Sequence, residues 1–253
     1  NLKKMGTQKA EQTAAILQTY ASQVLTTPDE YTATLQVSLS SHVDHYRCLI
    51  DGTRLLVTEM ALLLARTAGS FLTSIKGVGI VLASGVTAEI GDPMAQNSTS
   101  RLVSYAGIVP KVKQTGGSQG HAITGRVSKR CNHLLKDFVV QSAFHIGRFG
   151  PKELQDDYKR REAAGQHANF GMGRRFVRMA MCLMRTSQVY LPPDLKRTDI
   201  EPELRGGYYL TMWPQLKDKW SKAGALDVAF AKDKPLGQWR FIVQQLYGIK
   251  LKL

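Results

Sequence analysis

The chain of 253 residues has only three cysteines, Cys48, Cys131 and Cys182. They are widely spaced and form neither a CxxC pair nor a Cys/His ligand pattern. This spacing does not fit the usual zinc-binding motifs. We therefore expect reduced thiols in the core or half-buried, in an intracellular protein without a metal site of its own.

Long apolar runs are also missing. No stretch approaches the ~20 apolar residues that a helix needs to cross a bilayer, and the first residues do not have the pattern of a signal peptide. The chain begins at Asn1 rather than Met, as expected of a fragment or a processed protein. We expect an intracellular location, which would be organellar (mitochondrial) if Asn1 follows a removed targeting peptide.

Acidic residues are absent between Asp92 and Asp137, although seven lysines and arginines fall in this interval. The formal net charge of the whole chain is +14, which predicts attraction to polyanions. An anionic membrane surface is the competing partner, but we find no separate basic amphipathic helix with large apolar residues on its other face. Nucleic acid is therefore the favoured partner, and no membrane partner is expected.

The acid-free interval contains a central loop rich in glycine, serine, threonine and glutamine. Its cations are Lys111, Lys113, Arg126, Lys129 and Arg130. Backbone N–H groups and cations without competing carboxylates suit a ligand that carries phosphates. Ser128 is a candidate N-cap for the next helix, whose positive end would then face the same ligand. The alternative is a solvated loop without a ligand, but we predict phosphate contact.

Helical periodicity dominates the chain and predicts a mainly α fold, with short strands only near Val109–Val112 and Ile123–Val127. Helix formers fill residues 8–25, and a longer helix is expected over about residues 31–67. Its second half, LLVTEMALLLAR, is apolar nearly all round and is expected to be buried. These helices predict a long helical hairpin or coiled-coil region over residues 1–70, with a protein-partner surface along 31–67.

Residues 71–92 place two apolar segments around the turn Lys-Gly-Val-Gly. This pattern predicts a helix-hairpin-helix, in which Lys76, Gly77 and Gly79 contact a phosphate of nucleic acid. The two glycines carry no Cβ, so the backbone can approach the ligand closely. A plain tight turn between two helices fits the spacing equally well.

Two basic segments follow. The helix expected from His167 to Thr186 is amphipathic, and Arg174, Arg175 and Arg178 lie opposite its apolar face. These arginines are either solvated or part of a nucleic-acid-binding surface. After Pro192-Pro193, residues 194–253 contain all three tryptophans among many lysines. Such aromatics either stack on unpaired bases or pack this tail onto the body or a partner protein.

Four motifs in a fixed order resemble the C-terminal domain of the Piv-type insertion-sequence transposases, the bridge-RNA-guided recombinase family. They are SIKGVGIVLASGVTAEIGDP, RLVSYAGIVP, QTGGSQG and GRVSKRCNHLLK. The resemblance covers about residues 71–193, and the helical region before it also suits the family's layout. We accordingly expect three parts: the helical region 1–70, a transposase-like domain 71–193 containing the helix-hairpin-helix, and an extra C-terminal tail 194–253.

The resemblance implies a two-part active site. Family members carry an upstream RuvC-like domain whose four acidic residues bind divalent metal, while the C-terminal domain supplies a nucleophilic serine followed by glycine. The matching residues here are Thr115 and Gly116, with Ser118 as a less well aligned hydroxyl. Cys131 replaces the glycine of the family's KRGN pattern. No acidic constellation like the RuvC-like half is present in this sequence, so we expect no cofactor in this chain and divalent metal only through an upstream domain.

These features predict a nucleic-acid-binding protein derived from a transposase C-terminal domain and catalytically silent as it stands. We expect structured RNA rather than DNA, in a ribonucleoprotein. The alternative is the C-terminal half of an active RNA-guided DNA recombinase with Thr115 as its nucleophile. A third class is a scaffold that uses the long helix for dimerisation.

Overall fold

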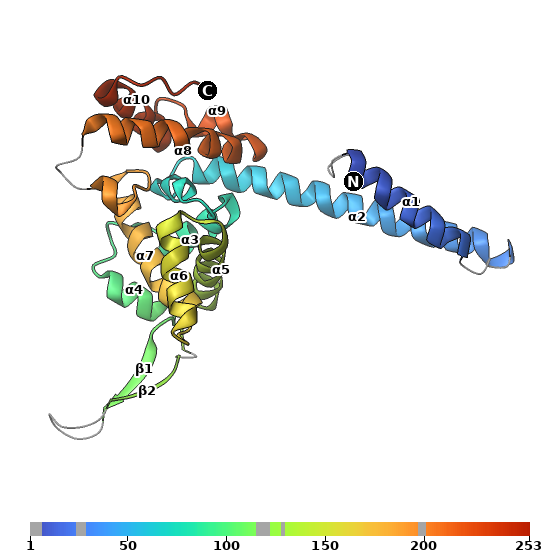
Figure 1. Ribbon diagram of the computed structural model, residues 1–253, viewed down its shortest axis with the longest axis horizontal. Helices are drawn as coiled ribbons and strands as arrows, with labels where there is room; N and C mark the ends of the chain where they lie inside the picture. Colours follow the sequence, from blue (N-terminus) through green and yellow to red (C-terminus); the bar gives the residue numbers. More distant parts are fainter. Residues whose placement is uncertain (1–6, 24–28, 115–121, 128–129, 197–200) are drawn as a thin grey trace. The chain divides into compact units, whose positions relative to one another are not determined.

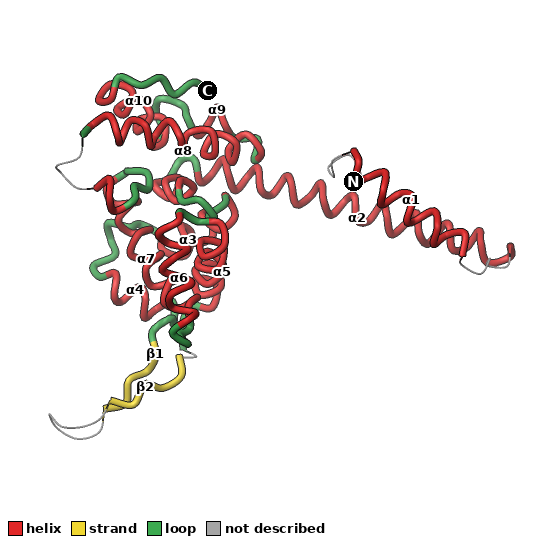
Figure 2. Tube along the Cα trace, in the orientation of Figure 1, coloured by secondary structure: helices red, strands yellow, loops and turns green. Residues whose placement is uncertain are grey.

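The computed structural model describes residues 7–23, 29–114, 122–127, 130–196 and 201–253. It is mainly α-helical, which confirms the predicted fold class (Figure 2). In chain order, and with the labels of Figure 1, the elements are α1 (Thr7–Gln23), α2 (Asp29–Leu64), the 3-10 helix η2 (Ala68–Ser74), α3 (Ile80–Ile90), α4 (Thr99–Tyr105), β1 (Pro110–Gln114), β2 (Ala122–Val127), α5 (His133–Phe149), α6 (Lys152–Ala163), α7 (Ala168–Thr186), the 3-10 helix η3 (Pro193–Lys196), α8 (Pro202–Lys222), α9 (Leu226–Ala229) and α10 (Pro235–Tyr247).

The chain divides into two compact units, residues 1–52 and 53–253. The first unit contains α1 and the first part of α2, and among its described side chains none is buried. The tail 194–253 belongs to the second unit. The predicted boundaries near residues 70 and 193 stay predictions.

The second half of α2 is not buried on all sides, so the expectation for LLVTEMALLLAR is wrong. Ala61 and Leu64 are buried, but Leu55, Leu56 and Leu63 are exposed. A helix that packs along one stripe leaves its other faces in solvent, whatever residues those faces carry. The apolar composition of this segment therefore did not predict its burial.

The core of the second unit lies between α3, α5, α6 and α7, which pack side by side with η2 (Figure 1). The packing of α3 on α5 is close because Gly85 faces Phe138. A Cβ at Gly85 would lie 2.5 Å from the Phe138 ring. Phe71 and Leu72 of η2 are fully buried in the same cluster, so η2 is part of the core.

The tail packs onto this core through its aromatic residues. Trp213, Trp220 and Trp239 are all buried, and both α8 and α10 contact η2. The indole Nε1 of Trp220 donates a hydrogen bond to Thr73 Oγ1 at 3.1 Å. Of the two alternatives for the tryptophans, the structure therefore supports packing, because buried indoles cannot stack on bases.

The two strands were predicted at nearly the observed places. β1 and β2 pair in an antiparallel hairpin between α4 and α5, with Val112 opposite Thr124 and Gln114 opposite Ala122. The next helix, α5, begins at His133 with Asn132 as its N-cap. The prediction that this helix begins at Ser128 is therefore wrong.

Candidate nucleic-acid interface

The central loop lies partly outside the described residues. Lys129 and the hydroxyl candidates Thr115 and Ser118, together with Gly116, fall there. Lys111 and Lys113 lie in β1 and Arg126 lies in β2, but the structure does not describe their side chains. Arg130 is exposed, two residues before the N-cap of α5. The roles predicted for all of these residues stay predictions.

The two ends of the hairpin are attached to the helical core. Before β1, the carbonyl of the buried Ile108 accepts a hydrogen bond from Arg174 Nη1 of α7 at 3.0 Å. Beyond β2, the backbone N–H of Asn132 donates to Tyr105 O at 2.9 Å. Burial lowers the pKa of the Arg174 guanidinium, and the nearby positive charge of Arg161 adds to this effect. Through its hydrogen bond to the carbonyl of Ile108, Arg174 contacts the protein's own backbone.

Asn132 joins three helices beside the hairpin. Its Oδ1 accepts from the N–H of Leu135 at 2.9 Å, which caps α5. Its Nδ2 donates to Glu89 of α3 at 2.6 Å and to the hydroxyl of Tyr105, the last residue of α4, at 3.0 Å. Asn132 was not among the residues predicted from the sequence. It could have been, because an asparagine directly before apolar residues at helical spacing is a usual start signal for a helix.

The Lys-Gly-Val-Gly turn connects η2 to α3. Lys76 is exposed, and Gly77 has a φ of +97°, which L side chains rarely adopt. A Cβ at Gly77 would also lie 2.8 Å from the carbonyl oxygen of His145. Gly79 is the N-cap of α3, with no side-chain hydrogen bond at the cap, and a Cβ there would meet nothing within 4 Å. The backbone at Gly79 is therefore accessible to a ligand.

A groove of about 500 Å³ lies beside this turn. Its walls include Gly77 and Gly79 from the turn, His145 from α5, and Lys219 and Lys222 from α8. Lys222 pairs with Asp218 at 2.6 Å, and its side chain is 75% exposed. The tail therefore contributes both a cation, Lys222, and its carboxylate partner, Asp218, to the lining of the groove.

Lys219 ties the tail to the turn. Its Nζ donates to the carbonyls of Thr73, Ile75 and Val78, the last two at 2.9 Å and 2.8 Å. Burial lowers the pKa of Lys219 to about 8, while three acceptors satisfy all the donors of its ammonium form. Local sequence patterns do not indicate this contact, because the partners of Lys219 are backbone atoms distant in the chain.

The other arginines of α7 are partly engaged within the protein. Arg175 Nη1 lies 2.9 Å from Asp157 Oδ2, and Arg160 and Arg161 pair with the same buried carboxylate. Burial alone would raise the pKa of Asp157, but the hydrogen bonds from Arg175, Arg160 and Arg161 lower it below its usual value. Arg178 is exposed. Among the three predicted arginines of α7, Arg178 is thus the most accessible to a ligand.

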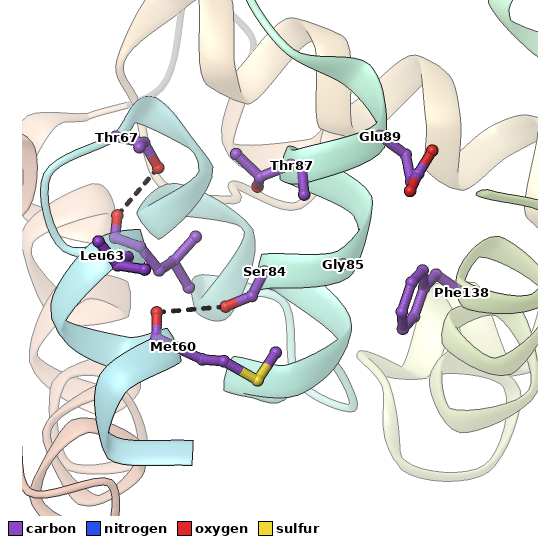
Figure 3. Close-up of a pocket in the computed structure, with 10 residues that line it drawn as sticks. Met60, Leu63, Thr67, Ser84, Gly85, Thr87, Glu89 and Phe138 are labelled. Carbon is purple, nitrogen blue, oxygen red and sulfur yellow. Dashed lines mark hydrogen bonds between the residues drawn. The ribbon is translucent and has the colours of Figure 1, made fainter. Parts of the chain in front are cut away.

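A second concavity is an apolar pocket of about 370 Å³ between α2, α3 and α5 (Figure 3). Met60, Leu63 and Phe138 line it, and Ser84 donates to the carbonyl of Met60 at 3.5 Å. Glu89 is the one ionisable residue among its described lining residues. This pocket therefore lacks the positive charge that phosphate contact requires.

The described part of the chain shows neither a metal site nor a single membrane-spanning helix. Within it, no three His, Cys, Asp or Glu side chains come together as a metal site. No single helix there is long and apolar enough to cross a membrane. One pair of helices bent by 116°, Tyr31–Leu64 with Ala68–Ser74, is together long and apolar enough for this.

Comparison with known proteins gives two matches. Residues 69–159 match the family described as "Transposase IS116/IS110/IS902 family". The chain is also 28% identical over 164 residues to the "Insertion element IS110 uncharacterized 43.6 kDa protein" of Streptomyces coelicolor. That alignment covers 63% of this chain and 39% of the relative, so the chain spans well under half of the relative's length. No solved structure matches. The segment that runs from η2 into α6 is therefore similar to the IS116/IS110/IS902 transposase family.

Proposed function

We propose that the chain is a nucleic-acid-binding protein derived from a transposase domain, and that it holds phosphates with the basic hairpin between Pro110 and Arg130. Structured RNA is the preferred ligand, and the chain is catalytically silent as it stands. The observation that carries the proposal is the acid-free interval, which forms a hairpin attached to the core at Ile108 and Asn132. Similarity to a transposase family supports a nucleic acid as the partner.

The attachment of the hairpin to the helical core favours a higher affinity for the ligand. Lysines and arginines on a freely moving segment lose conformational entropy when they bind. A hairpin whose ends are hydrogen-bonded to α7 and α4 is already ordered at its base, so less of the binding free energy is lost in ordering it. No carboxylate between Asp92 and Asp137 competes with the phosphates for these cations.

The glycine turn provides a second contact in this proposal, as a helix-hairpin-helix element. Gly79 lies at the N-terminus of α3, where the first backbone N–H groups have no partner within the helix and favour an anion. The exposed Lys76 lies on one side of the turn, and the exposed Lys222 lines the groove beside it. A phosphate at this turn would therefore meet backbone donors as well as cations.

The test is removal of the hairpin cations. The variant changes Lys111, Lys113, Arg126, Lys129 and Arg130 together to Ala. Binding to a structured RNA is then measured by fluorescence anisotropy across a salt series. If these cations contact phosphates, affinity falls and the slope of log K against log salt becomes shallower by up to about four, at roughly 0.7–0.9 per lost phosphate contact.

A matched control separates the hairpin from net charge. It removes the same number of exposed cations elsewhere in the second unit, by changing Lys152, Lys159, Lys232, Lys250 and Lys252 to Ala. Its affinity and salt slope should stay much closer to those of the wild type. Equal losses in the two variants would contradict the proposed interface and leave only a general attraction between charges.

A second candidate function is suggested by the short overlap with the relative, of which the alignment covers 39%. In this alternative the chain is the C-terminal half of an RNA-guided DNA recombinase, and Thr115 attacks DNA when a metal-binding domain is supplied. Thr115→Ala would then abolish metal-dependent strand transfer in the longer protein, while Thr115→Ser would keep it. If the chain is catalytically silent, we expect no strand transfer that depends on Thr115.

A further inference from the structure

Three backbone carbonyls around the glycine turn converge on one positive charge. The Nζ of Lys219 accepts no hydrogen bond but donates to the oxygens of Thr73, Ile75 and Val78, at 2.9 Å from Ile75 O and 2.8 Å from Val78 O. All three of these residues are fully buried. Without a cation between them, the three oxygens would face one another with unsatisfied partial negative charge. They therefore form a set of ligands that requires a positive charge at its centre.

The charge of Lys219 is balanced by these carbonyl dipoles rather than by a carboxylate. Within the described residues Lys219 forms no ion pair, and the neighbouring Asp218 pairs instead with Lys222 at 2.6 Å. Burial alone lowers the pKa of Lys219, to about 8, so the group is still charged at pH 7. A buried charge is costly unless its surroundings compensate it. Here the compensation comes from neutral oxygen ligands, as it does for many bound metal ions.

The geometry of the oxygens indicates which class of cation they suit. Magnesium binds oxygen at about 2.0–2.1 Å and calcium at about 2.3–2.6 Å, and both are usually held by carboxylates. The separations from Lys219 Nζ, 2.8 Å and 2.9 Å, are longer, and none of the three ligands is charged. Backbone carbonyls are the ligands that replace the hydration shell of K⁺ in K⁺ channels. The set therefore suits a large monovalent cation rather than a divalent one.

We propose that the carbonyls of Thr73, Ile75 and Val78 form a monovalent-cation site, and that the ammonium group of Lys219 fills this site in place of K⁺. Helix α8 holds the lysine in position, because the next residue, Trp220, is fully buried and donates to Thr73 Oγ1 at 3.1 Å. A cation that is part of the chain cannot dissociate. The turn therefore keeps its conformation whatever salt surrounds the protein.

An ion from solution can reach these carbonyls once the lysine side chain is shortened. Lys219 lines the groove of about 500 Å³ together with Gly77 and Gly79. Removing its side chain beyond Cβ opens the three oxygens toward the groove, where water supplies the remaining ligands of a bound ion. The charge of Lys219 also lies beside the turn at which phosphate contact is proposed. Only this last consequence rests on the proposed function, because the cation site needs no nucleic acid.

The test follows urea unfolding of Lys219→Ala and of the wild type in the full chain at pH 7. Potassium replaces tetramethylammonium, which is larger and has no N–H donor, at constant ionic strength. The wild type should not respond. In Lys219→Ala, the unfolding equilibrium constant should fall about tenfold for each tenfold rise in K⁺ above its dissociation constant. Ammonium should replace K⁺ in this effect, whereas the much smaller Li⁺ should not.

Lys217→Ala is the matched control, since it removes a lysine of the same helix that does not line the groove. Its stability should respond to K⁺ no more than that of the wild type, and a response equal to that of Lys219→Ala overturns the proposal. If Lys219→Ala is unfolded in tetramethylammonium, K⁺ should restore its helical circular dichroism. A Lys219→Ala protein whose stability does not depend on K⁺, or which stays unfolded throughout the series, also overturns it. No RNA is present, so these outcomes are independent of nucleic-acid binding.

Discussion

Lys219 shows how one side chain can determine the position of a turn. Its ammonium group donates to the carbonyls of Thr73, Ile75 and Val78, which lie around the start of the glycine turn. The neighbouring Trp220 is fully buried and bonds to Thr73. The tail therefore contributes to the candidate interface by holding the turn, even though its tryptophans are inaccessible to bases.

We expect Lys219→Met to destabilise the protein by about 2–3 kcal/mol at pH 7, because it leaves buried carbonyls without donors. Urea unfolding measures the change. Lys222→Met is the control on the same helix, since its side chain is 75% exposed and exposed ion pairs contribute little, about 0–1 kcal/mol. Equal costs for the two variants would contradict the role assigned to Lys219.

The pH dependence of Lys219 has a definite sign. Burial lowers its pKa from 10.5 to about 8 in the folded chain. Between these two values the unfolded chain binds more protons, so the free energy of unfolding rises with pH over that window. The difference in unfolding free energy between the wild type and Lys219→Met should therefore grow between pH 8 and 10.5. A constant difference would show that the folded pKa is not lowered.

At the scale of elements, helix caps and close contacts determine the frame of the hairpin. Asn132→Ala removes the N-cap of α5 and the bonds to Glu89 and Tyr105. Loss of a cap costs roughly 0.5–2 kcal/mol, and we expect a value at the upper end because two further bonds are lost. Thermal unfolding checks this. A change below about 0.5 kcal/mol, the usual size for a surface substitution, would contradict the assignment.

The two glycines of the turn separate folding from ligand contact. Gly77→Ala should destabilise the fold by more than about 1 kcal/mol, because φ is positive and His145 O is close. Gly79→Ala should cost less than Gly77→Ala, since a Cβ there meets nothing within 4 Å and only the preference for Gly over Ala at an N-cap is lost.

If phosphate approaches the backbone at the turn, Gly79→Ala nevertheless weakens RNA binding, because its methyl group occupies the approach. Anisotropy measurements at a fixed salt concentration detect the loss. Unchanged affinity in a stable Gly79→Ala protein would exclude the turn as a phosphate contact.

The positions of helices and strands were easier to predict from the sequence than the contacts that these elements make. The helices and the strands near Val112 and Thr124 follow from periodicity and turn residues. The burial of α2 did not follow, because apolar composition cannot say which face of a helix has a partner. The bonds from Asn132 to Glu89 and Tyr105 and the contacts of Lys219 depend on atoms far apart in the chain, which local patterns do not report.

At the scale of the whole molecule, the main feature is the strong positive charge of the chain. The charge of +14 is spread along the sequence, but the acid-free interval gathers part of it on one hairpin.

The most direct measurement is the affinity of the wild-type protein for a structured RNA and for a DNA duplex of the same length, each across a salt series. We expect tighter binding to the RNA and a steep fall of affinity with salt for both ligands, because several phosphates are contacted. Affinity that does not depend on salt, or that matches an unrelated protein of the same net charge, would contradict the claim that this chain is a nucleic-acid-binding protein.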